Sequence, residues 1–474
     1  MFMKHLITGL VVLCLSYSAH GNEKTAQNFI TVFNEGSQSE VIEYLSNNMS
    51  QSRIETYGLD AYVGVFLNEK NTYGKLKVLE YLPEKNNNDR IRVISQNNNF
   101  EYELVINKQS SPPHKINYSS FNDVELKNIK NASLTPKSFS QELAQFIDNL
   151  DNNNAFSGAV LVAKGQNVLF QKAVGYASKE WQVKNNLETK FSLGSMNKMF
   201  TAIAALQLIE KGKLKLDDKL VNFVDKSWLP EGDTDLITVR HLLTHTSGLG
   251  NFFNEEFNAS NKEAYRDLSA YKPLVASTPL LFKPGTRNRY SNSGMLMLGL
   301  IVESVTEESY YSYVDKHIYK KAGMQNSGSF ALDDVNNNLA TGYLKRMHSS
   351  GWVNSIYTRA IKGSPAGGGF STVGDLHRFS LALTQFKLLN KELTQAAYSE
   401  KTQYNSAPWY GYGFSVGGTD TNRVIGHGGA YLGVDARLDI HLDDDFIVVI
   451  LANQSDVVSP VRRKINELIS SYKP

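Results

Sequence analysis

The sequence predicts an α/β (α+β) protein in which a small α+β block precedes a larger block of helices and strands. The chain has 474 residues, more than the roughly 100 to 200 residues of one typical domain. Apolar residues recur at helical spacing near the N-terminus, and alternating extended segments follow them. In the larger block, extended segments lie at both ends with helices between them, so its sheet must be assembled from segments that are distant in the sequence.

Residues 1–21 have the features of a signal peptide. Lys4 gives a cationic start, Leu6–Leu15 is mostly apolar, and Ala19–Gly21 supplies small residues where a signal peptidase cleaves. The apolar run is shorter than the about 20 residues of a membrane-spanning helix. We therefore expect a mature chain that begins near Asn22 and a secreted, periplasmic protein.

Composition narrows the classes of partner. The chain has 49 basic and 47 acidic residues and a net charge of +2, which gives no electrostatic footprint for nucleic acid and no polybasic membrane anchor. Its single cysteine, Cys14, lies inside the expected signal peptide, so the mature chain has no disulfide and no cysteine-based metal site. We expect a small ester, amide or peptide substrate, no cofactor, no metal and no stable membrane insertion after signal cleavage.

The N-terminal block is expected over residues 22–121. Residues 25–45 carry apolar side chains at helical spacing with a turn at 34–36, which predicts a helix pair. A mostly polar linker is expected over residues 122–136. The segments with extended character are Leu76–Tyr81, Ile91–Ile94 and Phe100–Ile106.

Two phrases of this block, "FITVFNEGSQSEVIEYL" and "PPHKINYSSF", resemble the nuclear transport factor 2 type of domain. That resemblance implies a cone-like α+β domain in which helices wrap a curved sheet. It carries no catalytic signature. His114, the only histidine of the block, follows two prolines, and we interpret it as a residue that leads into a strand.

The second block is expected over residues 137–474. Phe156–Ala163 and Asn167–Tyr176 predict a β-hairpin, and Ser195–Lys211 predicts an apolar helix closed by Gly212. Further strands and a terminal helix are expected at Arg423–Ile425, Gly433–Leu442, Phe446–Leu451 and Val461–Tyr472.

The sharpest chemical signal is Ser195 followed three residues later by Lys198, at the start of the apolar helix. Residues three apart share one helical face, so the hydroxyl and the amine can meet. A serine hydroxyl needs a base in order to attack, and a lysine serves only when burial makes it neutral. The same Ser-x-x-Lys spacing is also typical of a serine that caps a helix and a lysine that is exposed to solvent.

Two further motifs bear on this alternative. The phrase YSN places Tyr290 and Asn292 before a second apolar helix, where a tyrosine can shuttle a proton and an asparagine can hold the substrate or the lysine. His427, Gly428 and Gly429 lie in a glycine-rich strand that a substrate backbone can approach closely. Taken singly, each motif also has a structural interpretation: the first as a tyrosine packed in the core, the second as the edge of a strand.

In this order and spacing, the three motifs resemble the active-site set of the serine β-lactamase and penicillin-binding-protein superfamily. The phrases "KFSLGSMNKMFTAIAALQLIEKGKLKLDD", "ITVRHLLTHTSGLG", "KPGTRNRYSNSGMLMLGLIVESVT" and "SPAGGGFSTVGDLHRFSLAL" are similar to the class C branch, with its esterases, D-aminopeptidases and D-Ala-D-Ala carboxypeptidases. The resemblance covers nearly the whole second block. It implies a β-lactamase/transpeptidase-like fold, with an antiparallel sheet flanked by helices plus an all-helical region.

The resemblance also implies a role for each motif. The nucleophile, its base partner, a second acid/base and a polar positioner would be Ser195, Lys198, Tyr290 and Asn292. Substrate would lie along His427, Gly428, Gly429 and Ala430, with the backbone amides of Ser195 and Ala430 as the oxyanion hole.

The sequence departs from this pattern at His427, where β-lactamases and carboxypeptidases of the superfamily usually carry the lysine of Lys-Thr-Gly. That lysine holds a substrate carboxylate. A histidine with its unperturbed pKa of about 6.5 is mostly neutral at periplasmic pH and holds an anion less strongly. We therefore expect small esters or amides without a carboxylate near the reacting carbonyl to be preferred, and penicillins to react slowly.

Other candidates have structural interpretations. His241 and His245 share helical spacing but lack an acidic base between them, so we expect capping or core roles rather than a metal site. Gly367–Gly369 is expected to form a tight turn, because no P-loop lysine follows it. The residues that could line an acyl pocket or pack in the core are Phe252, Phe253, Trp409 and Tyr412.

The sequence thus predicts a secreted serine hydrolase with a Ser-Lys-Tyr acyl-enzyme mechanism on small esters, amides or peptides. Three alternatives stay open: a D-Ala-D-Ala carboxypeptidase or weak β-lactamase, a non-catalytic penicillin-binding or sensor protein, and a ligand-binding role centred on the N-terminal block.

Overall fold

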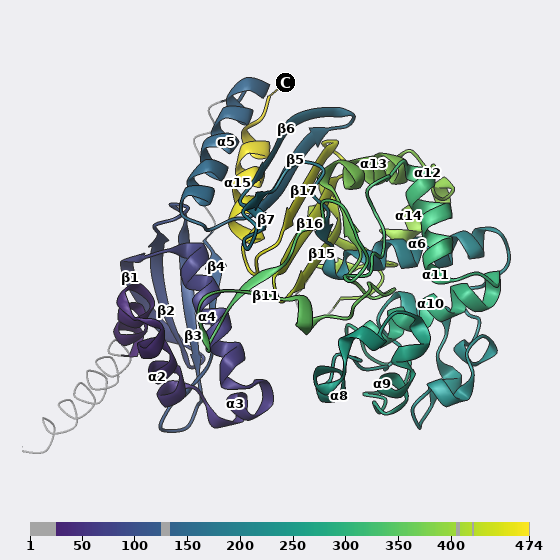
Figure 1. The fold of residues 1–474 in the computed structure, drawn as a ribbon, viewed down its shortest axis with the longest axis horizontal. Coiled ribbons are helices and arrows are strands. Elements are labelled where there is room, and N and C mark those ends of the chain that lie inside the picture. The colour runs from purple at the N-terminus through teal and green to yellow at the C-terminus, as the bar shows by residue number, and fades with distance from the viewer. Residues whose placement is uncertain (1–24, 125–132, 404–407, 420, 474) are drawn as a thin grey trace, which may run out of the picture. The chain divides into compact units, whose positions relative to one another are not determined.

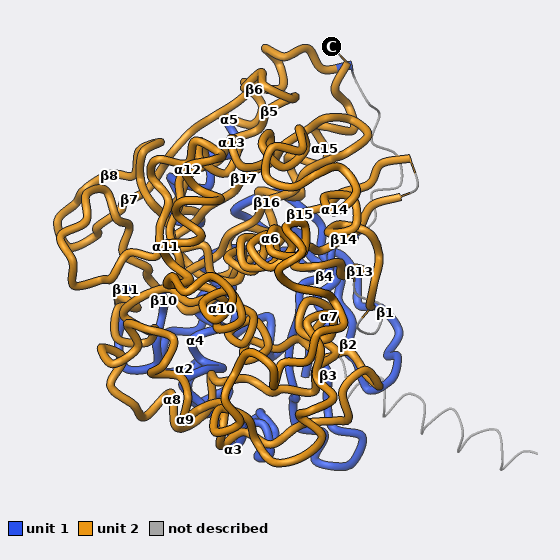
Figure 2. The backbone as a smooth tube through the Cα atoms, turned by 90° about the vertical axis from the view of Figure 1, so that its right-hand side faces the viewer, with its two compact units in different colours: residues 1–133, 145–155, 344–353 blue, residues 134–144, 156–343, 354–474 orange. Residues whose placement is uncertain are grey.

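The computed structural model describes residues 25–124, 133–403, 408–419 and 421–473. The chain forms two compact units (Figure 2). Unit 1 consists of residues 1–133, 145–155 and 344–353, and unit 2 of residues 134–144, 156–343 and 354–474. The expected signal peptide lies outside the described residues.

Unit 1 combines helices with a four-stranded antiparallel sheet in the order β1-β2-β3-β4. Phe29, Phe33 and Phe66 pack ring against ring in its core, with centroids 5.2 to 6.2 Å apart. After a helix over residues 25–35, its elements are α2 (Gln38–Asn48), α3 (Gln51–Tyr57), α4 (Leu59–Tyr73), β1 (Leu76–Lys85), β2 (Asn88–Ser95), β3 (Glu101–Lys108) and β4 (Ile116–Asp123). The helix pair and three of these strands were expected from the sequence.

Two later segments of the chain also belong to unit 1: the second part of α5 (Pro136–Asn152) and the tip of the hairpin formed by β10 (Tyr343–Arg346) and β11 (Ser349–Asn354). Within unit 1, Gln38 Nε2 donates a hydrogen bond to the Met347 carbonyl at 2.7 Å, and the Met347 amide donates to Asp60 Oδ1 at 2.9 Å. The hairpin tip is therefore bonded to the helices that open the chain.

Unit 2 contains a seven-stranded antiparallel sheet in the order β13-β14-β15-β16-β17-β5-β6 (Figure 1). The strand β17 pairs with β5 far earlier in the chain, with Val449 opposite Leu161. The expectation of a sheet assembled from distant segments is confirmed. Its strands are β5 (Gly158–Lys164), β6 (Asn167–Val174), β13 (Trp409–Tyr410), β14 (Ser415–Thr419), β15 (Asn422–Tyr431), β16 (Val434–His441) and β17 (Phe446–Ala452).

The two faces of this sheet bury different side chains because strand residues alternate in direction. Ile447, Val449 and Leu451 of β17 join the main core cluster with α6 (Asn197–Glu210) and α13 (Val373–Thr384). The helix α15 (Val458–Ser471) also packs against β17. This helix begins three residues before the expected start, and its Pro460 fits there because the first turn has no intrahelical use for that N–H.

A region made only of helices, from α6 to α12, lies between the β5–β6 hairpin and the C-terminal strands of unit 2. The predicted fold class is confirmed. None of the described helices is both long and apolar enough to cross a bilayer. The other described α-helices of unit 2 are α7 (Val239–Leu243), α8 (Glu255–Ala259), α9 (Lys272–Ala276), α10 (Asn292–Thr306), α11 (Tyr310–Val314), α12 (Lys320–Ala322) and α14 (Lys391–Ala397). All of these except α10 are short. The remaining short strands are β7 (Tyr176–Ser178), β8 (Val183–Lys184), β9 (Phe191–Ser192) and β12 (Phe370–Ser371).

Candidate active site

Ser195 lies in the single 3-10 turn η1 (Gly194–Met196), which leads directly into α6. Gly194 has φ +48° and its missing side chain leaves room for the backbone of β15, since a Cβ there would lie 3.0 Å from the Ala430 nitrogen. The helix α6 is buried on nearly all sides, so its start is held rigidly. Ser195 itself is partly exposed at the end of this buried element.

Lys198 lies one turn beyond Ser195 with no exposed surface. Its Nζ is 3.0 Å from Ser195 Oγ, 2.7 Å from Asn292 Oδ1 and 2.5 Å from the Ala366 carbonyl oxygen. None of these partners is a carboxylate. Because burial removes the water that would solvate an ammonium, the pKa of Lys198 lies well below its usual value of 10.5.

Tyr290 stands before α10, which is capped by Ser291 through a bond from the Gly294 amide to Ser291 Oγ at 2.8 Å. Lys198 Nζ lies 4.6 Å from the centroid of the Tyr290 ring. Tyr290 is 43% exposed, but the residues packed around its hydroxyl raise its pKa above the ordinary value of 10, although the Ser195 side chain opposes this shift. The phenol therefore keeps its proton at neutral pH.

The strand β15 runs past the backbone of Ser195 at very short range. A Cβ on Gly429 would lie 1.9 Å from the Leu193 carbonyl oxygen and 2.9 Å from the Ser195 nitrogen, so only glycine fits here. The next residue, Ala430, is exposed and pairs with Asp435 of β16. The backbone amides of Ser195 and Ala430 thus lie on adjacent segments beside the Ser195 hydroxyl.

His427 of β15 is 5% exposed and has both ring nitrogens engaged. Its Nδ1 lies 2.5 Å from the Gly428 carbonyl oxygen, which can only accept, so Nδ1 carries the proton; Nε2 then accepts from the Tyr410 hydroxyl at 3.2 Å. Burial, with Lys198 nearby, lowers the pKa of His427 to about 3. The imidazole is therefore neutral over the whole physiological pH range, which lies further above its pKa in the protein than above the pKa of a free histidine.

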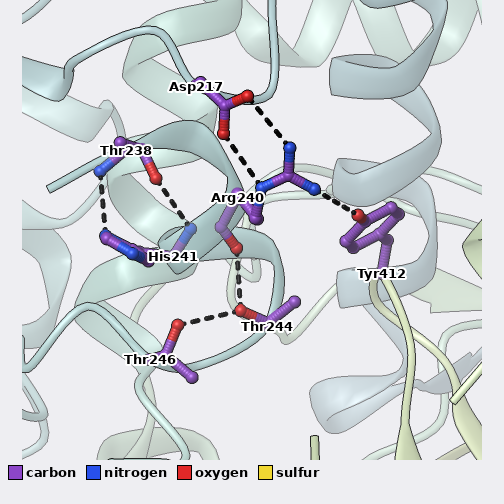
Figure 3. A network of polar contacts seen from close by, with 7 residues as sticks. All are labelled: Asp217, Thr238, Arg240, His241, Thr244, Thr246 and Tyr412. Carbon is purple, nitrogen blue, oxygen red and sulfur yellow. Dashed lines mark hydrogen bonds and ion pairs between the residues drawn. The ribbon is translucent and has the colours of Figure 1, made fainter. Parts of the chain in front are cut away.

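The two histidines of the phrase "RHLLTHTSG" have different surroundings. His241 closes a capping box with Thr238 at the start of α7, beside the Arg240 guanidinium that binds Asp217 and the Tyr412 hydroxyl (Figure 3). His245 instead adopts φ +57° and packs its ring against Tyr290, with centroids 4.5 Å apart. The capping interpretation suits His241, whereas His245 is part of the packing around the site.

His245 supports Tyr290 from behind. Its Nδ1 accepts a hydrogen bond from the Ser291 amide at 3.2 Å, and its Nε2 is buried without a partner among the described residues. Burial and the proximity of Lys198 hold the pKa of His245 well below its usual value. A left-handed backbone at a non-glycine residue is costly and persists only where the surroundings enforce it.

Ser195 opens on a cleft with about 60 Å³ of free space. Its wall includes Asn292, Phe253 and Ala430, but among the described lining residues neither Tyr290 nor His427 appears. Tyr290, which is 43% exposed, and His427, which is buried, therefore lie outside the wall of this cleft. Of the residues expected to form an acyl pocket, Phe253 lines the cleft, whereas Phe252 and Tyr412 are buried in the core and Trp409 is 38% exposed.

Gly367 and Gly368, in the turn at residues 367–369, line this cleft. The Gly368 amide donates to the Gly194 carbonyl at 3.0 Å, and the Leu193 amide donates to the Gly369 carbonyl at 2.7 Å. A Cβ on Gly367 would lie 2.8 Å from the Gly194 carbonyl oxygen. The glycines thus let this turn pack directly on the Ser195 turn.

Arg359 is a buried basic residue that lines the cleft, as the half-buried Lys362 also does, and it was not singled out from the sequence. It is 9% exposed, and its Nη2 donates to Ser192 Oγ at 3.0 Å and to the Gly368 carbonyl at 3.1 Å. Its guanidinium carbon lies 4.9 Å from the centroid of the Phe370 ring. Since no sequence motif surrounds it, only the folded contacts reveal its place.

The structure brings together all of the residues proposed for the site from the sequence. They lie on η1, α6, the segment that leads into α10, α10 itself and β15, and are Ser195, Lys198, Tyr290, Asn292, His427, Gly428, Gly429 and Ala430. Sequence reasoning missed Arg359 and Tyr410; it named His245 and expected a capping or core role, which its buried packing matches. Across the described ranges, no group of three or more His, Cys, Asp or Glu side chains is arranged to hold a metal ion.

Comparisons with known proteins agree with this geometry. The family model described as Beta-lactamase matches residues 143–469. Penicillin-binding protein 4* of Bacillus subtilis (strain 168) is 28% identical over 333 residues, which are 67% of this chain and 72% of that protein. Esterase EstB of Burkholderia gladioli is 33% identical over 221 residues, which are 42% of this chain and 55% of that protein.

A solved structure agrees as well. The crystal structure of a penicillin binding protein from Bacillus halodurans has a TM-score of 0.62 and 30% identity, and the match covers 70% of this chain and 99% of that one. Together, fold, site and relatives define the class: the protein is a serine hydrolase. The chain belongs to the beta-lactamase family.

Proposed function

We propose that the protein is a secreted hydrolase in which the carbonyl of a small ester or amide acylates Ser195, and water then releases the acid. The observation that carries this proposal is the set of contacts around Lys198 Nζ. That atom has three neighbours, of which two can only accept hydrogen bonds and the third is the Ser195 hydroxyl.

This set matches a neutral amine. A neutral lysine has two N–H donors and one lone pair, so the donors satisfy Asn292 Oδ1 and the Ala366 carbonyl. The lone pair then faces Ser195 Oγ, whose proton it can accept. The lowered pKa of Lys198 supports the same protonation state. Lys198 is thus the general base, and Asn292 orients it.

Acylation then proceeds with a balanced proton transfer. Ser195 Oγ forms a bond to the substrate carbonyl carbon as its proton passes to Lys198 Nζ. The negative charge on the former carbonyl oxygen faces the Ser195 and Ala430 amides, which act as preorganised donors. The short approach enforced by Gly429 supports this assignment.

Tyr290 supplies the proton that the leaving group needs. A phenol that keeps its proton at neutral pH can donate to a departing alkoxide or amine, and Lys198 beside the ring can replace that proton. In the second half, water attacks the acyl-enzyme and gives its proton to the same relay. The Ser195–acyl bond then breaks, the relay returns that proton to Ser195 Oγ, and the acid is released. No cofactor enters these steps.

One feature favours substrates without a carboxylate on the leaving group. His427, neutral and with both nitrogens engaged, offers no cation to a leaving-group carboxylate. The site therefore favours an ester or amide hydrolase over a D-Ala-D-Ala carboxypeptidase or a weak β-lactamase.

For unit 1, we infer a nuclear transport factor 2-like domain, supported by its four-stranded antiparallel sheet and the helices packed with it. We assign it no catalytic role, since the residues of the mechanism lie in unit 2.

The test combines labelling with turnover. Wild type and Ser195→Ala are incubated with a fluorophosphonate and with benzylpenicillin, and intact mass is measured; 4-nitrophenyl esters and D-amino amides are then assayed. We expect a single fluorophosphonate adduct that Ser195→Ala lacks, and ester turnover faster than penicillin turnover. Labelling that persists in Ser195→Ala would refute the nucleophile. Absence of both labelling and turnover in wild type would favour the non-catalytic alternative.

A further inference from the structure

Arg359 lies in the wall of the Ser195 cleft without an acidic partner. Among the described residues no carboxylate pairs with its guanidinium, and no aspartate or glutamate lines the cleft. A buried charge normally has a counter-charge, because desolvating an unpaired ion is strongly unfavourable. The Phe370 ring compensates only part of that cost.

The guanidinium also has donors to spare. An arginine carries five N–H donors, and Arg359 uses Nη2 alone, toward Ser192 Oγ and the Gly368 carbonyl. Its Nε and Nη1 have no hydrogen-bond partner within the described part of the chain, yet neither is among the fully enclosed unpaired atoms. The paired edge anchors the side chain to the turn beside Ser195, and the free edge remains for a ligand.

The position of Arg359 identifies which part of a substrate it would meet. Tyr290 and Lys198 must face the leaving group, since they deliver its proton, and Tyr290 does not line this cleft. The group that remains bound to Ser195 after acylation must therefore enter the cleft. A planar guanidinium with free N–H groups is suited to a carboxylate, which it can bind through two parallel hydrogen bonds.

We propose that Arg359 recognises a carboxylate carried by the acyl group, so that the preferred substrates are esters or amides of short dicarboxylic or acidic amino acids. This inference rests on the proposed function and adds its substrate class. It is compatible with the loss of a cation at His427, because the two positions lie on the leaving-group and acyl sides of Ser195. The anion site of this enzyme is then on the acyl side.

The experiment compares matched substrates. kcat/KM is measured for 4-nitrophenyl monoesters of glutaric and adipic acid and for the uncharged pentanoate and hexanoate esters, with the non-enzymatic rate subtracted. We expect wild type to prefer the acidic ester of at least one length by about tenfold or more, in line with charge-assisted hydrogen bonds. Arg359→Met should abolish this preference mainly through KM, and Arg359→Lys should retain part of it.

A structural role for Arg359 would give a different result, because both ester series would then fall by the same factor. Arg266→Met, which removes an exposed arginine paired with Asp333, is the matched control and should leave the preference unchanged. Equal rates for acidic and neutral esters in wild type at both lengths would overturn the proposal, as would an acidic preference that persists in Arg359→Met.

A binding measurement separates this inference from the mechanism. Adipate and glutarate are titrated calorimetrically into Ser195→Ala and into Ser195→Ala with Arg359→Lys, which keeps the cation if Arg359→Met fails to fold. Binding that weakens severalfold in the double variant supports the anion site even if no ester is hydrolysed, in which case only the proposed function fails. Undetectable binding of both dicarboxylates, with ester hydrolysis intact in wild type, would overturn the inference alone.

Discussion

Two buried basic side chains lie near Ser195, and burial leaves one of them neutral and the other charged. Lys198 has no exposed surface and Arg359 has 9%, and neither has a carboxylate partner. A lysine can escape the cost of desolvation by losing its proton, whereas burial lowers the pKa of Arg359 only to about 10, so it stays charged at neutral pH. The same environment thus makes a base on one side of the nucleophile and a fixed positive charge on the other.

The largest effect expected from breaking the Lys198 side is loss of turnover. Ser195→Ala and Lys198→Met should each lower kcat/KM for a 4-nitrophenyl ester by about a thousandfold or more, because nucleophile and base act as one unit. The double variant should be little worse than either single one. Ser227→Ala, an exposed serine of unit 2, is the control and should keep full activity. A Lys198→Met enzyme with near-normal rates would remove the base assignment.

Tyr290→Phe should have the next largest effect, and its size should depend on the leaving group. An alkoxide needs a proton far more than a 4-nitrophenolate does, so we expect a loss of about a hundredfold or more for an ethyl ester and a smaller loss for the 4-nitrophenyl ester. KM should change little. Equal losses for the two esters would indicate that Tyr290 serves packing rather than proton transfer.

The pH profile of turnover should report Lys198 and not Arg359. Activity requires the neutral amine, so kcat/KM should rise with pH and level off well below 10.5. Arg359→Lys should lower the plateau value of kcat/KM for acidic esters without changing the pH range over which kcat/KM rises. A limb centred near the ordinary lysine pKa would show that Lys198 is not desolvated in the working enzyme.

The smallest expected effect of replacing Lys198 or Arg359 is a change in how the free energy of unfolding depends on pH. Both folded-state pKa values lie below their unfolded values, so the unfolded chain binds more protons within each interval and unfolding free energy rises with pH there. For Arg359 that interval begins at about 10. Between about pH 8 and pH 10, the stability difference between wild type and Lys198→Met should therefore change with pH, whereas that for Arg359→Met should stay nearly constant. Urea titrations at each pH measure both, and parallel slopes would contradict the comparison.

The sequence revealed the Lys198 side of this comparison because its groups are local. Ser195 and Lys198 are one helical turn apart, and Tyr290 and Asn292 stand together at a helix start, so spacing alone suggests chemistry. The fold class and the superfamily were predicted from such phrases and are confirmed. The strand β15 joins two segments that were each expected to be strand, Arg423–Ile425 and the glycine-rich stretch at residues 427–429.

The Arg359 side could not be predicted in this way. Its surroundings come from Ser192, Gly368 and Phe370, which meet only when β9 and β12 pair. No periodicity marks a side chain that is buried by contacts this distant. The contact of His245 with Tyr290 was not predicted for a related reason, since its left-handed backbone and its packing on Tyr290 follow from tertiary contacts rather than from helical spacing.

The hairpin tip at residues 344–353 bears on how this protein can be recombined. Because unit 1 takes residues from three stretches of the chain, the backbone passes from one unit to the other five times, after residues 133, 144, 155, 343 and 353. A gene fragment that ends at residue 133 is therefore not a transferable cassette, since it leaves behind the partners of Gln38 and Asp60. Substitutions at Gln38 or Asp60 must remain compatible with the hairpin residue Met347, to which both are bonded. Because that hairpin lies between two stretches of unit 2, we expect the two units to be inherited and exchanged together.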